Sequence, residues 1–356
     1  MSQLTQTPGN TPLYSVPQDY FPEGCGFWLK LSKGLDKGKN LFFRDSNHGK
    51  KTPNNTILFI HGNPECSYSY RKVIRRLLKK ISEPIRIVNP DHIGFGLSDQ
   101  ASYEMVCMDH ANNLSELVST LDLQNITMVI HDWGGPIGVG ALLKAPTRLK
   151  NIIILNSTVF PLSNQGMSYR NYPISWLGWA KTPYIIPNRF WGAFASYAMF
   201  VQPKGSIRLL SNMLKYILTA ELGKLPKNEL NIRSIVRQQF LSKPNVKSSK
   251  RLVLQSAFWA HGNVFTDPKI GRRDTKPFYD FIQSNIKPSW GGETNRIGAY
   301  AIIGKWDPLG NKDVLRQWSE NLPQLRNHIS LFPDAGHFIE EIRYKEIADA
   351  IIKSIT

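Results

Sequence analysis

Short apolar runs alternate with stretches of helical spacing through the first part of the chain, up to Pro161. TILFI ends at the turn HGNP, and the runs IRIV, ITMVI and NIIIL each end at a turn in the same way. Between them, RKVIRRLLKKI and NNLSELVSTLDL place apolar residues three and four positions apart. Uninterrupted apolar strands that alternate with helices are typical of a parallel sheet covered on both faces. The pattern therefore predicts an α/β fold with a doubly wound, mostly parallel sheet and right-handed crossovers.

The pattern changes after Pro161 and returns late in the chain. Residues 162–275 lose the short strand alternation and are rich in Pro, Trp and Tyr, which predicts a mainly helical insertion, a cap, above the sheet. IGAYAIIGKWDP then resumes the strand pattern, HISLFPDAGHF adds another strand, and YKEIADAIIKSI predicts a final helix. We therefore expect a core in two parts, residues 1–161 and 276–356, with the cap inserted between them.

Composition and charge narrow the class of protein without changing this picture. Hydrophobic residues make up 41% and charged residues 20% of the 356 residues, which excludes disorder, collagen and a coiled coil. The formal net charge of +17 can indicate nucleic acid or an anionic membrane as a partner. The basic residues, as in RKVIRRLLKK and KPNVKSSKR, are spread along the chain without a nucleic-acid-binding module. We therefore expect a solvated basic surface and no nucleic-acid partner.

Targeting signals and cysteines bear on the compartment. No apolar stretch reaches the roughly 18 residues of a membrane-spanning helix, and MSQLTQTPGN lacks the apolar centre of a signal peptide. Cys25, Cys66 and Cys107 show no C-x-x-C spacing, which favours neither a disulfide framework nor a zinc site. The sequence predicts a cytoplasmic protein with no membrane span and no bound metal, and it leaves the oligomeric state open.

The turn in VIHDWGG places one polar residue, Asp132, between a buried strand and a helix. Gly134 and Gly135 allow the tight backbone approach of a nucleophile elbow, in which a sharp strand-to-helix turn exposes the central side chain. Asp stands where the esterase pattern has Ser. A carboxylate is already ionised at neutral pH, so it can displace a leaving group from carbon without a base and form a covalent ester.

Hydrolysis of that ester requires a base, and two residues late in the chain are suited to supply it. A water must be activated by a histidine that is itself held by a carboxylate. His337 in DAGHF and Asp307 in GKWDP both follow late strands, and the order nucleophile, acid, histidine is the one expected for this fold. We therefore predict Asp132, Asp307 and His337 as the catalytic triad, with Asp313 as the alternative acid.

These motifs together carry a family resemblance. HGNPECSYSYR, NPDHIGFGLSD, HDWGGPIG, GKWDP and DAGHF resemble, in this order, motifs of the α/β-hydrolases of the haloalkane dehalogenase group. The resemblance covers residues 56–160 and 298–350. It implies that Asn63 and Trp133 donate hydrogen bonds to a departing halide, and that their backbone N–H groups form the oxyanion hole. It also implies a small hydrophobic substrate, water as the second reactant and no cofactor.

Alternatives to a dehalogenase remain open. One subgroup of the family pairs an Asp in the place of Asp307 with the same Asn and Trp; the other subgroup has its acid where this chain has Asn156. The first subgroup includes proteins similar to the beta-lactone decarboxylase of bacterial olefin biosynthesis. An epoxide hydrolase would need acid donors, and four tyrosines are available: Tyr169, Tyr172, Tyr184 and Tyr197. A non-catalytic binding protein on this fold is a further alternative.

Several other polar residues are interpreted as structural. Asp91, His92 and Asp99 lie in a turn-rich loop and are expected to bond backbone groups. His61 and His131 adjoin the site and are expected to be satisfied by hydrogen bonds, and Asp334 is expected to order its loop. The uncharged stretch of residues 190–201 is too short to cross a membrane and is assigned to packing over a substrate pocket.

Overall fold

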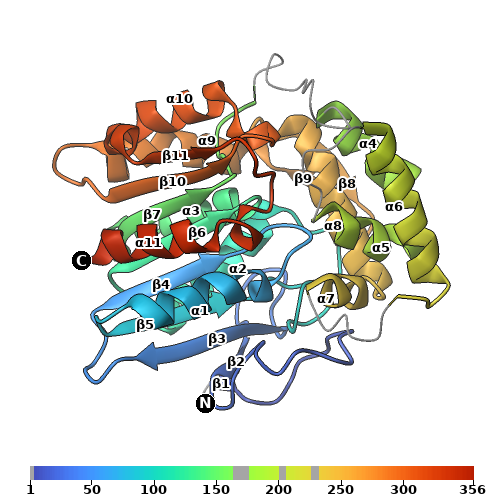
Figure 1. Cartoon of the computed structure of the whole chain (residues 1–356), viewed down its shortest axis with the longest axis horizontal. Coiled ribbons are helices and arrows are strands. Elements are labelled where there is room, and N and C mark those ends of the chain that lie inside the picture. The colour runs from blue at the N-terminus through green and yellow to red at the C-terminus, as the bar shows by residue number, and fades with distance from the viewer. Residues whose placement is uncertain (1–3, 163–175, 200–205, 226–231) are drawn as a thin grey trace.

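A nine-stranded sheet forms the centre of the molecule (Figure 1). The computed structural model describes residues 4–162, 176–199, 206–225 and 232–356. The strand order is β1-β2-β3-β5-β4-β6-β7-β10-β11. From β5 to β11 all pairs are parallel, whereas β1, β2 and β3 pair antiparallel at one edge. The strands are β1 Leu4–Thr5, β2 Gly26–Lys30, β3 Asn40–His48, β4 Asn55–Ile60, β5 Ile85–Pro90, β6 Ile126–His131, β7 Leu149–Leu155, β10 Gly298–Gly304 and β11 Ile329–Phe332.

Helices cover both faces of this sheet, which is why its central strands are apolar throughout. One face carries α1 Arg71–Lys80 and α11 Tyr344–Ile355, and the other carries α2 Cys107–Thr120, α3 Gly134–Leu142 and α9 Lys276–Ile286. The remaining core helix is α10, Lys312–Asn321. The prediction of a doubly wound, mostly parallel α/β fold is confirmed. The antiparallel edge strands were not predicted.

A layer of helices stands beyond the carboxyl ends of the parallel strands (Figure 1). It consists of α4 Trp176–Ile185, α5 Trp191–Ala198, α6 Ser206–Glu221, α7 Ile232–Gln239 and α8 Lys243–Gln255; we call α4 to α8 the helical layer. A small antiparallel pair follows it, β8 Val264–Asp267 with β9 Gly271–Asp274, which the sequence pattern did not indicate. Within the described ranges, no helix is long and apolar enough to cross a membrane.

Candidate active site

Asp132 lies on a strained turn between β6 and α3. Its φ is +49°, a left-handed conformation that costs free energy in a residue other than glycine and recurs at functional sites. The turn is tight because a Cβ on Gly134 would lie 2.2 Å from the Ile60 carbonyl oxygen, and one on Gly135 would lie 1.9 Å from Ser157 Oγ. Ser157 Oγ also donates a 2.6 Å hydrogen bond to the Asp132 carbonyl. Two glycines and a neighbouring strand end therefore hold this turn in place.

The two oxygens of the Asp132 carboxylate have different surroundings. Oδ2 accepts a 2.8 Å hydrogen bond from the backbone N–H of Asn63, in the loop after β4. Oδ1 lies 3.3 Å from His337 Nε2. The loop approaches so closely that a Cβ on Gly62 would lie 2.4 Å from Oδ2. Because Oδ2 is held by a backbone donor, Oδ1 is the oxygen suited to attack, and Oδ2 is the one that can develop negative charge.

His337 lies between two carboxylates. Its Nδ1 is 2.8 Å from Asp307 Oδ2, and Asp307 follows β10 at the carboxyl edge of the sheet. Burial by itself lowers the pKa of His337, but the charge of Asp307 and the hydrogen bonds to Asp132 and Asp307 outweigh burial and raise this pKa well above its usual range. The two neighbouring carboxyl groups therefore favour the positively charged form of His337. The alternative acid, Asp313, lies in the first turn of α10 and pairs with Arg316 at 3.9 Å.

Asn156 holds Asp307 from the end of β7, a role that the sequence analysis did not assign. Its Nδ2 donates to Asp307 Oδ2 and to the Gly304 carbonyl, the latter at 2.9 Å, while its Oδ1 accepts from the Gly304 N–H at 2.8 Å. Leu309 N donates to the other Asp307 oxygen at 3.2 Å. The signal in the sequence was a polar residue at a strand end, but its partner Asp307 follows β10, much later in the chain.

The side chain of Asn63 is oriented by the helical layer. Ser249 Oγ, on α8, donates to Asn63 Oδ1 at 2.6 Å and accepts from Trp191 Nε1 at 2.9 Å. Asn63 Nδ2 makes only a long 3.5 Å contact with the Ser249 carbonyl, so this amide group keeps donor capacity toward the cavity. Ser249 lies in a polar stretch of the sequence that carries no sign of this role.

Trp133 follows Asp132 and lies against the same cavity. Its ring stacks on Trp259 with centroids 3.8 Å apart, and the Trp259 indole N–H donates to the Thr158 carbonyl at 2.9 Å. The cavity has a volume of about 40 Å³ and is lined by Asn63, Asp132, Trp133, Trp179, Ala198, Val253, Ser256, Trp259, Asp307, Pro308, His337 and Phe338. The structure thus brings all five predicted site residues to one cavity beneath the helical layer.

The tyrosines considered as acid donors do not line this cavity where they are described. Tyr184 is exposed at the end of α4, and Tyr197 on α5 contacts Tyr216 at a ring separation of 5.5 Å. Tyr169 and Tyr172 lie outside the described residues. An acid donor for epoxide opening is therefore missing from the described cavity lining.

The sequence analysis did not predict a buried network that lies behind Asp132 and His337. Glu65, His131 and Glu340 are fully buried. Glu65 Oε2 accepts from the Gly62 N–H at 3.0 Å and contacts His131 Nδ1 at 2.8 Å, while His131 Nε2 donates to the His337 carbonyl at 2.8 Å. The network therefore joins the loop that holds Asn63 to the loop that holds His337.

Charge within this network is divided between the two carboxyl groups. Burial opposes ionisation of Glu65, but His131 together with hydrogen bonds lowers its pKa. Burial and then the charge of Glu65 raise the pKa of Glu340 well above its usual range. These are the residues among those described whose arrangement resembles a metal site. Both ring nitrogens of His131 already contact protein atoms, so the geometry favours a proton network over a bound ion.

The other polar residues have the structural roles expected of them. His92 N donates to His61 Nε2 at 3.0 Å, so His61 is protonated on Nδ1, which donates to the Gly62 carbonyl at 2.7 Å. Asp91 accepts from Ser67 N at 2.6 Å and Leu97 N at 2.7 Å. Asp99 accepts from the Asn40 N–H. His92 contacts the His61 carbonyl, and Asp334 pairs with Arg343.

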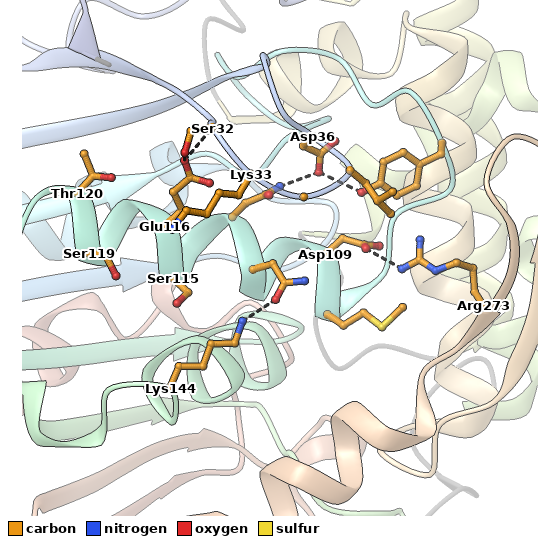
Figure 2. A pocket seen from close by; sticks show the side chains of 16 residues that line it. Ser32, Lys33, Asp36, Asp109, Ser115, Glu116, Ser119, Thr120, Lys144 and Arg273 are labelled. Atoms are coloured by element: carbon orange, nitrogen blue, oxygen red, sulfur yellow. Dashed lines mark hydrogen bonds and ion pairs between the residues drawn. The ribbon is translucent and has the colours of Figure 1, made fainter. Parts of the chain in front are cut away.

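A larger polar cavity of about 620 Å³ lies along α2, away from the triad (Figure 2). Two of its charged groups have protein partners: Arg273 pairs with Asp109 at 2.7 Å, and Asp36 accepts from Asn113 at 2.8 Å. Ser32 Oγ donates to Glu116 in this cavity at 2.7 Å, but no histidine is among its described lining residues. Cavity volume therefore does not identify the candidate active site, because the cavity that contains Asp132 and His337 is much the smaller of the two.

Comparison with known proteins assigns the family. A model of the alpha/beta hydrolase fold matches residues 55–341, so the chain belongs to this family. The chain is 28% identical over 306 residues to a cis-3-alkyl-4-alkyloxetan-2-one decarboxylase from Shewanella oneidensis, covering 85% of this chain and 81% of that protein. It is 33% identical over 112 residues to haloalkane dehalogenase 2 of Mycobacterium tuberculosis, covering 31% and 38%.

Solved structures agree on the fold. A tetrameric haloalkane dehalogenase from Paraglaciecola agarilytica superposes with a TM-score of 0.64 at 21% identity, covering 97% of both chains. The predicted resemblance to α/β-hydrolases of the dehalogenase group is confirmed at the level of relatives. These relatives fall into two reaction classes.

Proposed function

We propose that this protein is a hydrolase that uses Asp132 as a nucleophile and forms an alkyl ester with its substrate, and that haloalkane dehalogenation is its reaction. One observation carries the proposal: His337 lies between Asp132 and Asp307, at 3.3 Å and 2.8 Å, at the wall of a cavity that also receives Asn63 and Trp133. No serine or cysteine takes the place of the nucleophile on the turn.

In the first step, Asp132 Oδ1 attacks the carbon that bears the halogen. The carbon–halogen bond breaks, and the halide leaves with the bonding electrons. The Asn63 amide and the Trp133 indole are neutral donors, so they can stabilise this anion without forming an ion pair with Asp132. A cavity of about 40 Å³ has room for an atom of this size beside the carboxylate.

In the second step, His337 Nε2 takes a proton from water, and the oxygen of that water attacks the ester carbon. Negative charge then develops on Oδ2, where the Asn63 N–H already donates. The proton on His337 passes to the departing alkoxide, and Asp132 is restored. Esterification removes the Asp132 charge, which is one cause of the raised His337 pKa. Ester formation thereby lowers this pKa and makes His337 a competent base.

The test is bromide release from a chain-length panel of brominated alkanes, with intact-mass analysis of a His337→Phe variant. We expect release by the native protein and a trapped ester, whose added mass names the alkyl group, in the variant. An Asp313→Asn variant serves as the control because Asp313 contacts Arg316 rather than His337. Absence of both bromide and added mass across the panel would exclude dehalogenation.

A second candidate is decarboxylation of a beta-lactone that carries long alkyl chains. Similarity to the Shewanella protein over most of both chains favours it, whereas the curated dehalogenase match covers 31% of this chain. Asp132 would attack the saturated ring carbon that is bonded to the ring oxygen. The bond between that carbon and the ring oxygen would break and free a carboxylate. Loss of carbon dioxide would then form the alkene and expel Asp132.

The two candidates differ in their need for water. Elimination restores Asp132 without hydrolysis, so a His337→Phe variant would still release alkene from a long-chain beta-lactone but would stop after one alkylation by a haloalkane. Incubation in ¹⁸O-labelled water adds a second readout. Dehalogenation through the ester introduces the label into the Asp132 carboxylate, and elimination does not.

A further inference from the structure

Helix α6 exposes a stripe of leucines on the outside of the helical layer. Leu214 and Leu218 on α6 and Leu222 directly after it are 58%, 52% and 66% exposed, and their spacing of four residues places them on one side of the helix and its end. The opposite side, with Met213 and Ile217, packs into the core cluster against α5. Figure 1 shows α6 as the outermost helix of the layer. The stripe is therefore apolar surface that folding leaves in water.

The sequence segment that contains the helical layer, residues 176–255, carries much of the net positive charge of the chain. Between residues 176 and 255 there are 13 Lys and Arg residues but only 2 Asp and Glu residues. The rest of the chain has 31 basic and 25 acidic residues. Basic residues occur along the whole chain, as the sequence analysis noted, but acidic residues are scarce between residues 176 and 255. On α6 and just after it, Arg208, Lys215 and Lys224 are exposed, and Glu221 is the one exposed acidic residue there.

We propose that α6 docks the protein on the surface of an anionic lipid membrane. The leucine stripe would enter the boundary between headgroups and acyl chains, and the surrounding basic side chains would contact anionic headgroups. An amphipathic helix with leucines on one face and lysine or arginine around it has the properties of an interfacial helix. Each basic side chain near an anionic surface strengthens binding about fivefold.

Charge selects the membrane over a second copy of this chain. Two helical layers brought face to face would each carry the same strong positive charge, so like-charge repulsion opposes that contact. An anionic bilayer offers the opposite charge together with an apolar interior. A nucleic acid would satisfy the charge but offers no apolar environment for three leucines.

Docking would also place the cavity near a source of apolar substrate. Helix α6 packs on α5, and Ala198 at the end of α5 lines the cavity that contains Asp132. This consequence rests on the proposed function, because it assumes an apolar substrate that partitions into lipid. The docking itself does not depend on any catalytic activity.

The experiment is co-sedimentation of the full chain with phosphatidylcholine vesicles, with and without roughly one third phosphatidylglycerol, at low and at about 0.15 M salt. We expect binding to the anionic vesicles that weakens as salt rises. A combined Leu214→Ser, Leu218→Ser and Leu222→Ser variant should bind on the order of 100-fold more weakly. Lys215→Gln and Lys224→Gln should each weaken binding about fivefold.

The control for the leucine variant is the substitution of one exposed leucine that lies outside the helical layer. Leu35→Ser changes a side chain that is 56% exposed outside the helical layer and should leave vesicle binding unchanged. Circular dichroism of each variant establishes that the fold is retained. Absence of binding to anionic vesicles at low salt would overturn the proposal. A leucine variant that binds vesicles as tightly as the native chain would also overturn it. If that variant only has a smaller mass in light scattering, the leucines serve contact between copies of the chain instead of membrane docking.

Discussion

The sheet core and the helical layer differ in how they treat charge. In the core, the charged groups near the site are buried and matched, as in the pair of His337 with Asp307 at 2.8 Å and of Glu65 with His131 at 2.8 Å. In the segment of residues 176–255, which contains the helical layer, basic residues outnumber acidic ones by 13 to 2, and leucines on and just after α6 are exposed. The core is thus built to fix a few polar atoms in position. The helical layer instead presents exposed leucines to the surroundings of the molecule.

One contact joins the two regions at the site. Ser249 of the layer holds the side chain of Asn63, which belongs to the core loop. If the core performs the chemistry and the layer governs access and location, substitutions in the core should change chemical steps far more than substitutions in the layer. The following predictions test this division, beginning with the largest expected effect.

Asp132→Asn should abolish ester formation, with a loss of activity of about 10⁴-fold or more, because an amide is a poor nucleophile. The measurement is product release together with intact mass. The same variant should lower the His337 pKa, since Asp132 helps to raise it, and NMR titration of the imidazole reads this change. Asp313→Asn, which alters an exposed carboxylate on α10, is the control. Retained alkylation in Asp132→Asn would place the nucleophile elsewhere.

Trp133→Phe should slow alkylation by a haloalkane about 10² to 10³-fold, because it keeps an aromatic ring but removes one donor to the leaving group. Ester hydrolysis should be affected less, which single-turnover kinetics can separate. Trp259→Phe is matched to it, since that indole stacks on Trp133 but donates to the Thr158 carbonyl. Equal rates for the native protein and Trp133→Phe would mean that Trp133 only packs.

Glu65→Gln should lower kcat roughly 10 to 100-fold with little change in KM. The substitution disturbs the buried network that aligns the Asn63 and His337 loops, and misplacement of reacting groups is costly. The pH profile should shift as well, because a charge near His131 is removed. Glu116→Gln is the control, since Glu116 accepts from Ser32 on the far side of α2. If Glu65→Gln changes thermal stability but leaves kcat and the pH profile unchanged, the network has only a structural role.

Ser249→Ala should have the smallest effect, a loss of about 3 to 10-fold in the alkylation step, because it removes one hydrogen bond that orients Asn63. The neighbouring Ser248 provides the control. It is equally buried, but its hydroxyl has no hydrogen-bond partner among the described residues, so Ser248→Ala should be neutral. A loss of activity in Ser249→Ala as large as that in Trp133→Phe would contradict the proposal that the core alone performs the chemistry.

Local sequence patterns determined the fold and the turn that carries Asp132. Strand alternation depends on neighbouring residues, and the elbow depends on Gly134 and Gly135 directly after Asp132, so both leave signals within a short window. The antiparallel strands β1 to β3 were not predicted. Their stabilisation comes from pairing with β5, which lies far along the chain, rather than from a periodic pattern of their own.

Tertiary structure alone decided the contacts that complete the site. Asn156 meets Asp307, Glu65 meets His131, and Ser249 meets Asn63 across separations of 151, 66 and 186 residues. A hydrogen bond requires a specific distance and direction, and no local pattern encodes these for residues on different elements. The exposure of α6 was decided in the same way. Its periodicity marks an amphipathic helix, but only packing against α5 determines which apolar side chains are covered and which leucines remain in water.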